Sequence, residues 1–332
     1  MKSSPCVVRL WKLVLAVAVS LTLVAQGRAD GPLKWKFKQG DALEYVMERA
    51  VDGKLNLSGA DIEFKLKMTF DTTWKVTAVA ADGTASVDQS LERLQVSMDS
   101  PLAGSLEYDS AAPTKPDSPA WSMMIEPMVT GLLGQTLKWK VSPQGKVTDI
   151  EMPEKLKETF AKQSEGGNRQ AGLGLGGNMF SDRGLREFVE KSVAPLSDQA
   201  PGKDVTWKQS FESPIPRIGT QTAETTFSFA GADKLDGKSV EKIKTVTELT
   251  FEPADDAQAD LEITAQAASG TIYFDPAAGR MIKAEDTQSS TKEITGPREL
   301  TQEVKEVSTI RMGKSPAPKP AAKEEKDKDA AK

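Results

Sequence analysis

The sequence predicts a protein of the α+β class that is mainly β, with curved antiparallel sheets in two similar modules and a helical segment packed on the apolar face. Apolar and polar residues alternate along many short segments, which is the period of a half-buried strand. Asp-Gly pairs at 52–53, 82–83 and 236–237 favour tight hairpins between such segments. Sheets with one packed face and one solvated face are usually antiparallel.

The first 29 residues have the pattern of a secretory signal peptide. Basic residues precede an apolar run from 13 to 25, and Gly27 and Ala29 are the small residues that a signal peptidase reads. The run is short for a membrane span, which takes about 20 apolar residues. We therefore expect cleavage after Ala29 and a secreted or periplasmic protein of the bacterial envelope, with no stable membrane span after cleavage. An uncleaved signal anchor is the alternative.

Residues 30–116 form the first predicted β module. Residues 61–71 alternate strictly, so one face of that strand carries Ile62, Phe64, Leu66, Met68 and Phe70. A shorter alternation predicts a strand at 33–38, and strand-like segments follow at 73–80 and 84–98.

Residues 117–200 form a predicted helical segment with a β-hairpin at 137–151. Apolar residues at helical spacing predict three helices, and the simplest interpretation is that they cover the apolar face of the sheet as core. The first helix is rich in Met. Because thioethers adapt to irregular ligands, a second interpretation is an apolar ligand pocket. Its candidate residues are Trp121, Met124, Ile125, Met128 and Leu132.

Residues 201–312 form the second predicted β module, with strand-like segments that include 205–211, 240–251, 259–265 and 270–274. This module resembles the first in several short motifs. The stretch 40–45 is similar to 202–207, and 104–110 is similar to 270–276. Two modules of similar plan explain this, and so does chance similarity among hairpins, which share turn residues. The sequence leaves open whether the modules share one sheet.

Residues 313–332 are rich in Pro, Ala and charged residues, so we expect a disordered tail. The leader carries four of the 43 basic residues and none of the 48 acidic ones, so the mature chain has a net charge of −9. An acidic chain argues against nucleic acid and anionic membrane as electrostatic partners.

The composition excludes much catalytic chemistry. The chain has no His, and its one Cys, Cys6, lies in the leader. A Ser-His-Asp relay, a thiolate nucleophile, a His- or Cys-bound zinc and a disulfide are therefore all excluded from the mature chain. We expect no enzyme activity, no cofactor and no metal.

Two motifs match the residue patterns of known sites but lack the secondary structure that those sites need. The glycines at 172–177 match a dinucleotide fingerprint, but no predicted strand precedes them. Ser239 and Lys242 match the Ser-x-x-Lys of serine acyl-transferases, but in the predicted strand they face opposite sides.

Several features together resemble a family of exported bacterial proteins of unknown function: the export signal, Gly40-Asp41, Asp82-Gly83, Tyr108-Asp109-Ser110 and the 139–147 hairpin. The resemblance covers most of residues 33–300 and implies a two-part β-rich fold in the bacterial envelope. It implies no catalytic residue. At the level of fold alone, a curved sheet covered by helices is also similar to the lipoprotein-carrier and lipid-binding proteins of the periplasm.

Three functions fit the sequence. The first is a noncatalytic exported envelope protein that binds a hydrophobic ligand or a protein partner. The second is a structural or interaction module with no small-molecule ligand, which a filled core and an exposed apolar patch would favour. The third is a hydrolase that uses carboxylates alone, which two converging carboxyl groups would favour.

Overall fold

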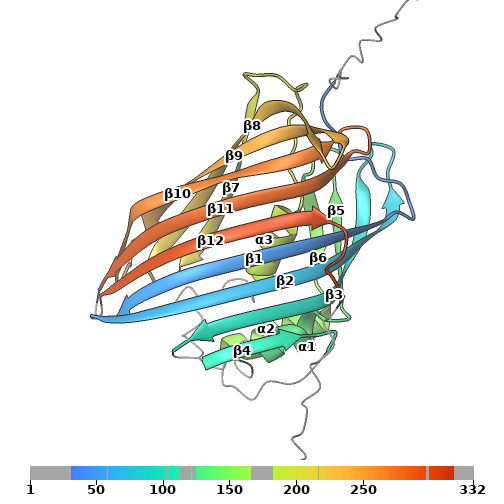
Figure 1. The fold of residues 1–332 in the computed structure, drawn as a ribbon. Helices are drawn as coiled ribbons and strands as arrows, with labels where there is room; N and C mark the ends of the chain where they lie inside the picture. Colours follow the sequence, from blue (N-terminus) through green and yellow to red (C-terminus); the bar gives the residue numbers. More distant parts are fainter. Residues whose placement is uncertain are drawn as a thin grey trace, which may run out of the picture.

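The computed structural model describes residues 31–57, 59–101, 104–112, 121, 125–165, 182–215, 217–296 and 299–317. The predicted signal peptide, the glycines at 172–177 and most of the predicted tail lie outside these residues. In the described part, long strands dominate and three helices lie on one side of them (Figure 1). The mainly β, antiparallel prediction is confirmed.

All twelve strands of the described chain belong to one sheet, in the order β6-β5-β3-β2-β1-β12-β11-β10-β9-β8-β7. β4 lies off this path and pairs with β3, as β5 does at the other end of β3. The strands are β1 (Ala42–Leu57), β2 (Ala60–Val79), β3 (Ala85–Ser100), β4 (Gly104–Asp109), β5 (Thr136–Val141), β6 (Val147–Glu151), β7 (Thr206–Ile215), β8 (Gly219–Leu235), β9 (Lys238–Pro253), β10 (Asp260–Asp275), β11 (Arg280–Thr295) and β12 (Leu300–Met312).

The strands of the two predicted modules meet at β1, which pairs antiparallel with β2 on one side and with β12 on the other. The first and last strands of the described residues are therefore neighbours in the middle of the sheet. This answers the question that the sequence left open, because strands from both modules form one continuous sheet.

The predicted polarity of β2 is confirmed over residues 64–68, whereas Thr69 and Asp71 on the polar face are buried as well. Phe64 and Leu66 are buried, whereas Lys65 and Lys67 are exposed. The buried side chains face the inside of the curled sheet, where the helices lie (Figure 1). Burying an aliphatic or aromatic side chain of this kind stabilises the fold by roughly 1.5–3 kcal/mol.

The three helices are α1 (Glu126–Leu132), α2 (Glu154–Glu165) and α3 (Asp182–Ser192). α3 buries Leu185 and Val189 in the main core cluster. Farther along α3, the Phe188 ring lies 5.3 Å from that of Phe70 on β2, and Lys191 Nζ lies 5.2 Å from the Phe211 ring on β7. α3 therefore crosses the inside of the curl, from the β2 side to the β7 side.

Two local predictions are wrong. Asp52-Gly53 is not a hairpin turn, because both residues lie within β1. Residues 33–38 alternate as predicted, with Trp35 buried, but they form no strand. Their backbone instead bonds to two separate turns, since Trp35 N donates to Pro143 O and Lys36 N donates to Gly279 O.

The ladder between β9 and β10 ends early, because it holds six pairs and stops at Val246 and Ser269. Beyond this point the Gln266 side chain bridges to the β9 backbone. Its amide oxygen accepts from Leu249 N at 2.6 Å, and its amide nitrogen donates to Leu249 O at 2.9 Å. These are the two hydrogen bonds that a paired strand residue would make.

The C-terminal residues that follow β12 cross the outer face of β2 and β3. Arg93 makes a bidentate ion pair with Asp109 and donates to Pro316 O at 2.6 Å. Ser315 Oγ donates to Asp71 at 2.5 Å. Residues 313–317 thus form a strap, a name that we keep below.

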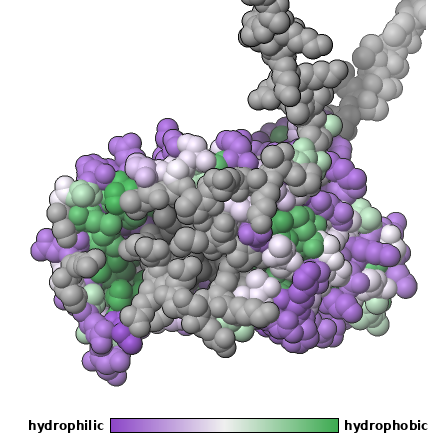
Figure 2. Space-filling model, turned by 90° about the horizontal axis from the view of Figure 1, so that it is seen from below, coloured by the Kyte–Doolittle hydropathy of each residue, from purple (hydrophilic) through white to green (hydrophobic). Residues whose placement is uncertain are grey.

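Seen from below, the face of the described chain carries many hydrophilic side chains, with hydrophobic areas among them toward both sides of the view (Figure 2). None of the helices in the described ranges has the length and apolar content that crossing a membrane would require.

Candidate functional site

The predicted pocket residues that the structure describes are part of a core. Trp121 and Ile125 are 4% and 1% exposed, and the Trp121 ring lies 4.5 Å from that of Tyr108. Leu132 is partly buried and packs against both core clusters. Met124 and the side chain of Met128 lie outside the described residues. Because two of its five members are missing from the description, the apolar pocket stays a prediction.

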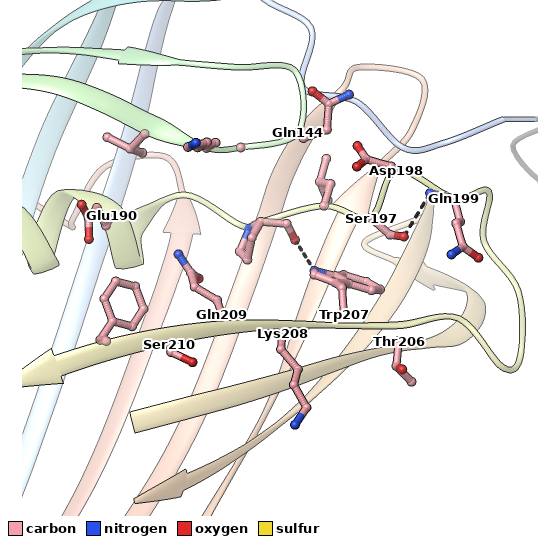
Figure 3. A pocket seen from close by; sticks show the side chains of 16 residues that line it. Gln144, Glu190, Ser197, Asp198, Gln199, Thr206, Trp207, Lys208, Gln209 and Ser210 are labelled. Carbon is pink, nitrogen blue, oxygen red and sulfur yellow. Dashed lines mark hydrogen bonds between the residues drawn. The ribbon is translucent and has the colours of Figure 1, made fainter. Parts of the chain in front are cut away.

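A different hollow lies where the two ends of the sheet approach each other. A pocket of about 570 Å³ is lined by residues 144–147 beside β6, by residues 195–199, by residues 206–211 of β7, and by Glu190 on α3 (Figure 3). We call it the seam pocket. Its volume lies within the range of about 300–1,000 Å³ that small-molecule sites occupy.

Trp207 is the largest side chain of the seam pocket, and three contacts hold it in place. Its Nε1 donates to Pro195 O at 3.1 Å (Figure 3). Its ring stacks on Phe227 at 5.5 Å with an interplanar angle of 11°, and lies 5.0 Å from Phe229. Because the polar end of the indole is satisfied and one face is packed, the ring is rigid while it stays only half-buried.

The opposite wall depends on a glycine. Gly145 has φ +79°, and a Cβ there would lie 2.2 Å from Ala194 O. The same carbonyl accepts a hydrogen bond from Trp35 Nε1 at 2.9 Å, and Leu196 N donates to Gln144 O at 2.8 Å. The 142–146 turn and the 194–197 segment are therefore locked together, so this wall is fixed.

The seam pocket holds two carboxyl groups at its opposite ends, Glu190 and Asp198 (Figure 3). Burial raises the pKa of Glu190 above its ordinary value, and the neighbouring charge of Glu187 raises it further. On β7, Lys208 forms an ion pair with Glu224 on the outer side. The other lining residues include two with aromatic rings, Trp207 and Phe211, and several with amide or hydroxyl groups.

A second polar feature lies inside the curl, on a row of cross-strand neighbours: Arg49, Ser308, Asp286, Gly270 and Thr245. Arg49 forms an ion pair with Glu306 at 2.7 Å. A Cβ at Gly270 would lie 2.9 Å from the Asp286 carboxyl oxygen, so the missing side chain makes room for this carboxyl. Burial raises the pKa of Asp286 to about 6, with Glu306 adding to the increase and Lys191 opposing it. We call this the inner polar row.

The described residues show no cluster typical of metal binding. They contain no group of three or more acidic side chains that could hold a metal ion. Ser239 and Lys242 lie on β9, at positions that face opposite sides of the sheet, as the sequence predicted. The glycines at 172–177 lie outside the described residues.

Sequence reasoning placed a strand at 205–211 but did not single out Trp207 or Phe211. It could not have assembled the seam pocket, because residues 144–147 and 206–211 meet only through the curl of the whole sheet. The inner polar row was also missed, since strict alternation predicts an apolar inner face. The polar inner residues Ser290, Gln288 and Asp286 on β11 are the signal that was available.

The fold and the seam pocket define a protein built on a single curled antiparallel sheet, with helices inside the curl and an open pocket where its ends approach. Residues 82–294 match DUF6263, a family of unknown function. The match covers more than half of the chain, so this chain belongs to the DUF6263 family. This agrees with the resemblance to an exported β-rich family of unknown function.

Among solved structures, lipovitellin, studied for its lipid–protein interactions, is 11% identical with a TM-score of 0.41. The alignment covers 86% of this chain and 27% of that one, so this chain spans about a quarter of lipovitellin's length. An exported protein with a YmcC-like fold from Bacteroides fragilis is 7% identical, with a TM-score of 0.21 and coverage of 85% and 100%.

A domain named for outer membrane lipoprotein sorting, from Vibrio parahaemolyticus, is 10% identical, with a TM-score of 0.14 and coverage of 85% of this chain and 88% of that one. All three similarities are weak, and none bears on function. No curated protein matches this chain significantly.

Proposed function

We propose that this chain is a noncatalytic binding protein of the bacterial envelope, and that the seam pocket holds an amphipathic ligand or partner segment. The observation that supports this is the pair of half-buried aromatic rings, Trp207 and Phe211, in an open pocket whose other lining groups are mostly polar. Aromatic side chains that stay partly exposed in a fixed setting are typical of binding sites. The leader pattern supports the location.

The pocket favours binding over hydrolysis. A glycosidase needs two carboxyl groups about 5–10 Å apart, on either side of the bond to be broken. Glu190 and Asp198 lie at opposite ends of the seam pocket, so these two carboxyl groups do not converge on one point in it (Figure 3). The mature chain also has no histidine that could transfer a proton near neutral pH.

A fluorescent amphiphile tests this proposal. Anilinonaphthalene sulfonate has an apolar ring system and one charged group, and we expect it to bind the folded protein with a rise in emission. Phe211→Ser should weaken that binding by about tenfold, which corresponds to about 1.4 kcal/mol. Val307→Ser is the matched control, because Val307 is 41% exposed on the outer face of β12.

Equal loss in both variants, or no binding by the wild-type protein, would contradict the proposal. Native mass spectrometry of the protein purified from its own host complements the titration, because a retained small ligand would appear as added mass.

A further inference from the structure

We propose that the partner of the seam pocket is an extended segment of another polypeptide, which binds by adding a strand to the free edge of β7. This deepens the function proposed above and rests on the same pocket. Four observations support it: the direction of the β7 backbone groups, the part of β7 that the pocket touches, the way the rest of that edge is blocked, and the wall that faces the edge across the pocket.

The hydrogen bonds of Gln266 establish which backbone groups of β7 are free. Leu249 N and O both point toward β10, because they bond to the Gln266 amide. In an antiparallel sheet the direction alternates from residue to residue, so Glu248 bonds to Glu224 on β8. Ala223 and Thr225 then point to β7 and pair with Phe211 and Gln209.

It follows that Lys208 and Ser210 direct their N–H and C=O groups away from β8, toward the free edge. β7 ends the strand order, so no strand of the described chain pairs with that edge. An unpaired row of alternating donors and acceptors is the template for strand addition.

The pocket opens on this edge rather than on one face of the strand. Six consecutive residues, 206–211, line it. Side chains alternate between the two faces of a strand, so a hollow that touches every residue in a run lies along the backbone edge. A six-residue strand is about 20 Å long, which is the length of a typical strand in a sheet.

The remainder of the β7 edge is blocked, whereas the pocket part is not. Pro214 lies near the far end of β7, outside the residues that line the pocket. Proline on an edge strand prevents pairing, and so does an unpaired lysine. In the pocket part the single lysine, Lys208, is held on the outer side by Glu224. The edge is therefore open where the pocket lies.

The side chains of β7 specify the chemistry of the added segment. Trp207, Gln209 and Phe211 share the inner face with Phe227, whereas Lys208 and Ser210 share the outer face. An added strand would place alternate residues against the aromatic rings and the others toward solvent. The expected segment is therefore amphipathic, with apolar residues at every second position and no proline among them.

A second copy of this chain fits poorly, because the wall formed by residues 144–147 and 195–199 faces the edge across the seam pocket. Two such edges cannot reach each other without moving both walls, whereas a single peptide can enter. The C-terminal residues 313–332 of this chain fit poorly too, since they contain three prolines and no large apolar residue.

Strand addition depends on the backbone N–H groups of the bound peptide, whereas binding through side chains alone does not. A fluorescein-labelled peptide of three Val-Thr repeats is titrated against the full-length protein, with anisotropy as the readout. Two N-methylated forms of this peptide, which are isomers of each other, are then titrated in the same way. One is methylated at the backbone nitrogen of every Val and the other at that of every Thr. Only one set of N–H groups faces β7, so one isomer should bind at least tenfold more weakly than the other.

A backbone variant tests the same point from the protein side. Ser210→Pro removes an N–H that faces the free edge and leaves the ladder to β8 intact, so it should weaken peptide binding at least tenfold. Ser210→Ala keeps the N–H and removes only the hydroxyl, so it should weaken peptide binding much less than Ser210→Pro does. Thermal melts of both variants check the fold, and the isomer experiment does not depend on them.

Equal binding of the two methylated isomers would overturn strand addition. So would a peptide that fails to bind while anilinonaphthalene sulfonate still does, and this result would leave the proposed function standing. Failure of both probes would overturn both proposals. A dimer that forms at high concentration and is lost in Ser210→Pro would identify a second copy as the occupant instead.

Discussion

Asp286 lies on the inner polar row, where burial partly removes its carboxyl group from water. Its pKa is raised to about 6, first by burial and then by the nearby Glu306. In the unfolded chain the same group has a pKa of about 3.9. The folded protein therefore holds a proton on Asp286 between about pH 4 and pH 6 that the unfolded chain releases.

The first prediction concerns this proton. Because the folded-state pKa is raised, the contribution of Asp286 to stability is present below pH 4 and is lost as the pH rises through 6. Asp286→Asn removes the buried charge and should stabilise the protein at pH 7.5 by roughly 1 kcal/mol, after allowance for solvent screening. Thermal melts at pH 4, 6 and 7.5 should show the gain only at the higher values.

The control for this titration is Asp256→Asn, at an exposed position in the loop between β9 and β10. Its stability should follow that of the wild-type protein at every pH. A gain that is equal at pH 4 and pH 7.5 would mean that the amide improves packing and that ionisation is not the cause.

At the scale of elements, β2 is a strand whose buried face can be predicted from the sequence. Its strict alternation fixed which residues face the core, since a shift by one position would expose all of them. β1 shows the opposite case. Asp52-Gly53 has turn chemistry, yet it lies in mid-strand because the Phe64 ring covers the glycine, where a Cβ would be only 2.0 Å from it. That packing partner lies on another strand and cannot be read from local residues.

The second prediction tests the polarity of β2 with a matched pair. Phe64→Ser removes a ring that is 3% exposed and should cost about 3–5 kcal/mol, because it leaves a cavity and buries a hydroxyl. Lys65→Ser changes the next residue, on the exposed face, and should cost about 0.5 kcal/mol or less. Urea unfolding measures both. Similar costs would show that β2 is buried on both faces.

Some strands are longer than the sequence pattern predicts. Residues 259–265 and 270–274 were predicted as two strands but form the single strand β10, which contains a bulge after Ile263. The polar stretch between them, 266–269, lacks the apolar alternation that signals a strand. It is held instead by its ladder with β11 and by the Gln266 amide.

At the scale of the whole molecule, the strap joins the C-terminal end to the outer face of β2 and β3. The third prediction compares two truncations. Ending the chain after Ala317 keeps the Arg93–Pro316 and Ser315–Asp71 hydrogen bonds and should leave the melting temperature unchanged. Ending it after Met312 removes both and should cost about 1–3 kcal/mol, since each involves a charged partner. Equal melting temperatures would mean that the strap adds nothing to stability.

The fourth prediction concerns export, which the described residues do not test. The leader predicts that the mature protein begins at Asp30 and is found outside the cytoplasm. Amino-terminal sequencing of the protein from its own host measures the start directly. An intact Met1 on a membrane-bound chain would establish the signal anchor in place of a cleaved signal.

The candidate site depends on this largest scale, and that is why only its parts could be predicted. The strand at 205–211 and the 139–147 hairpin follow from local patterns. Their meeting depends on the strand order, on the curl, and on the lock between Gly145 and Ala194. These are properties of the complete sheet.

The central place of β12 has a consequence for the order in which the molecule can be made. β1 is synthesised among the first strands, but one of its two neighbours is the last strand to emerge. Until then β1 has an unpaired edge, and the hairpins of the second half cannot dock against it. Contacts between such distant segments form slowly, because a very long loop must close first. We therefore expect the final step of folding to be the docking of the two halves through β1 and β12, which can begin only after β12 has been synthesised.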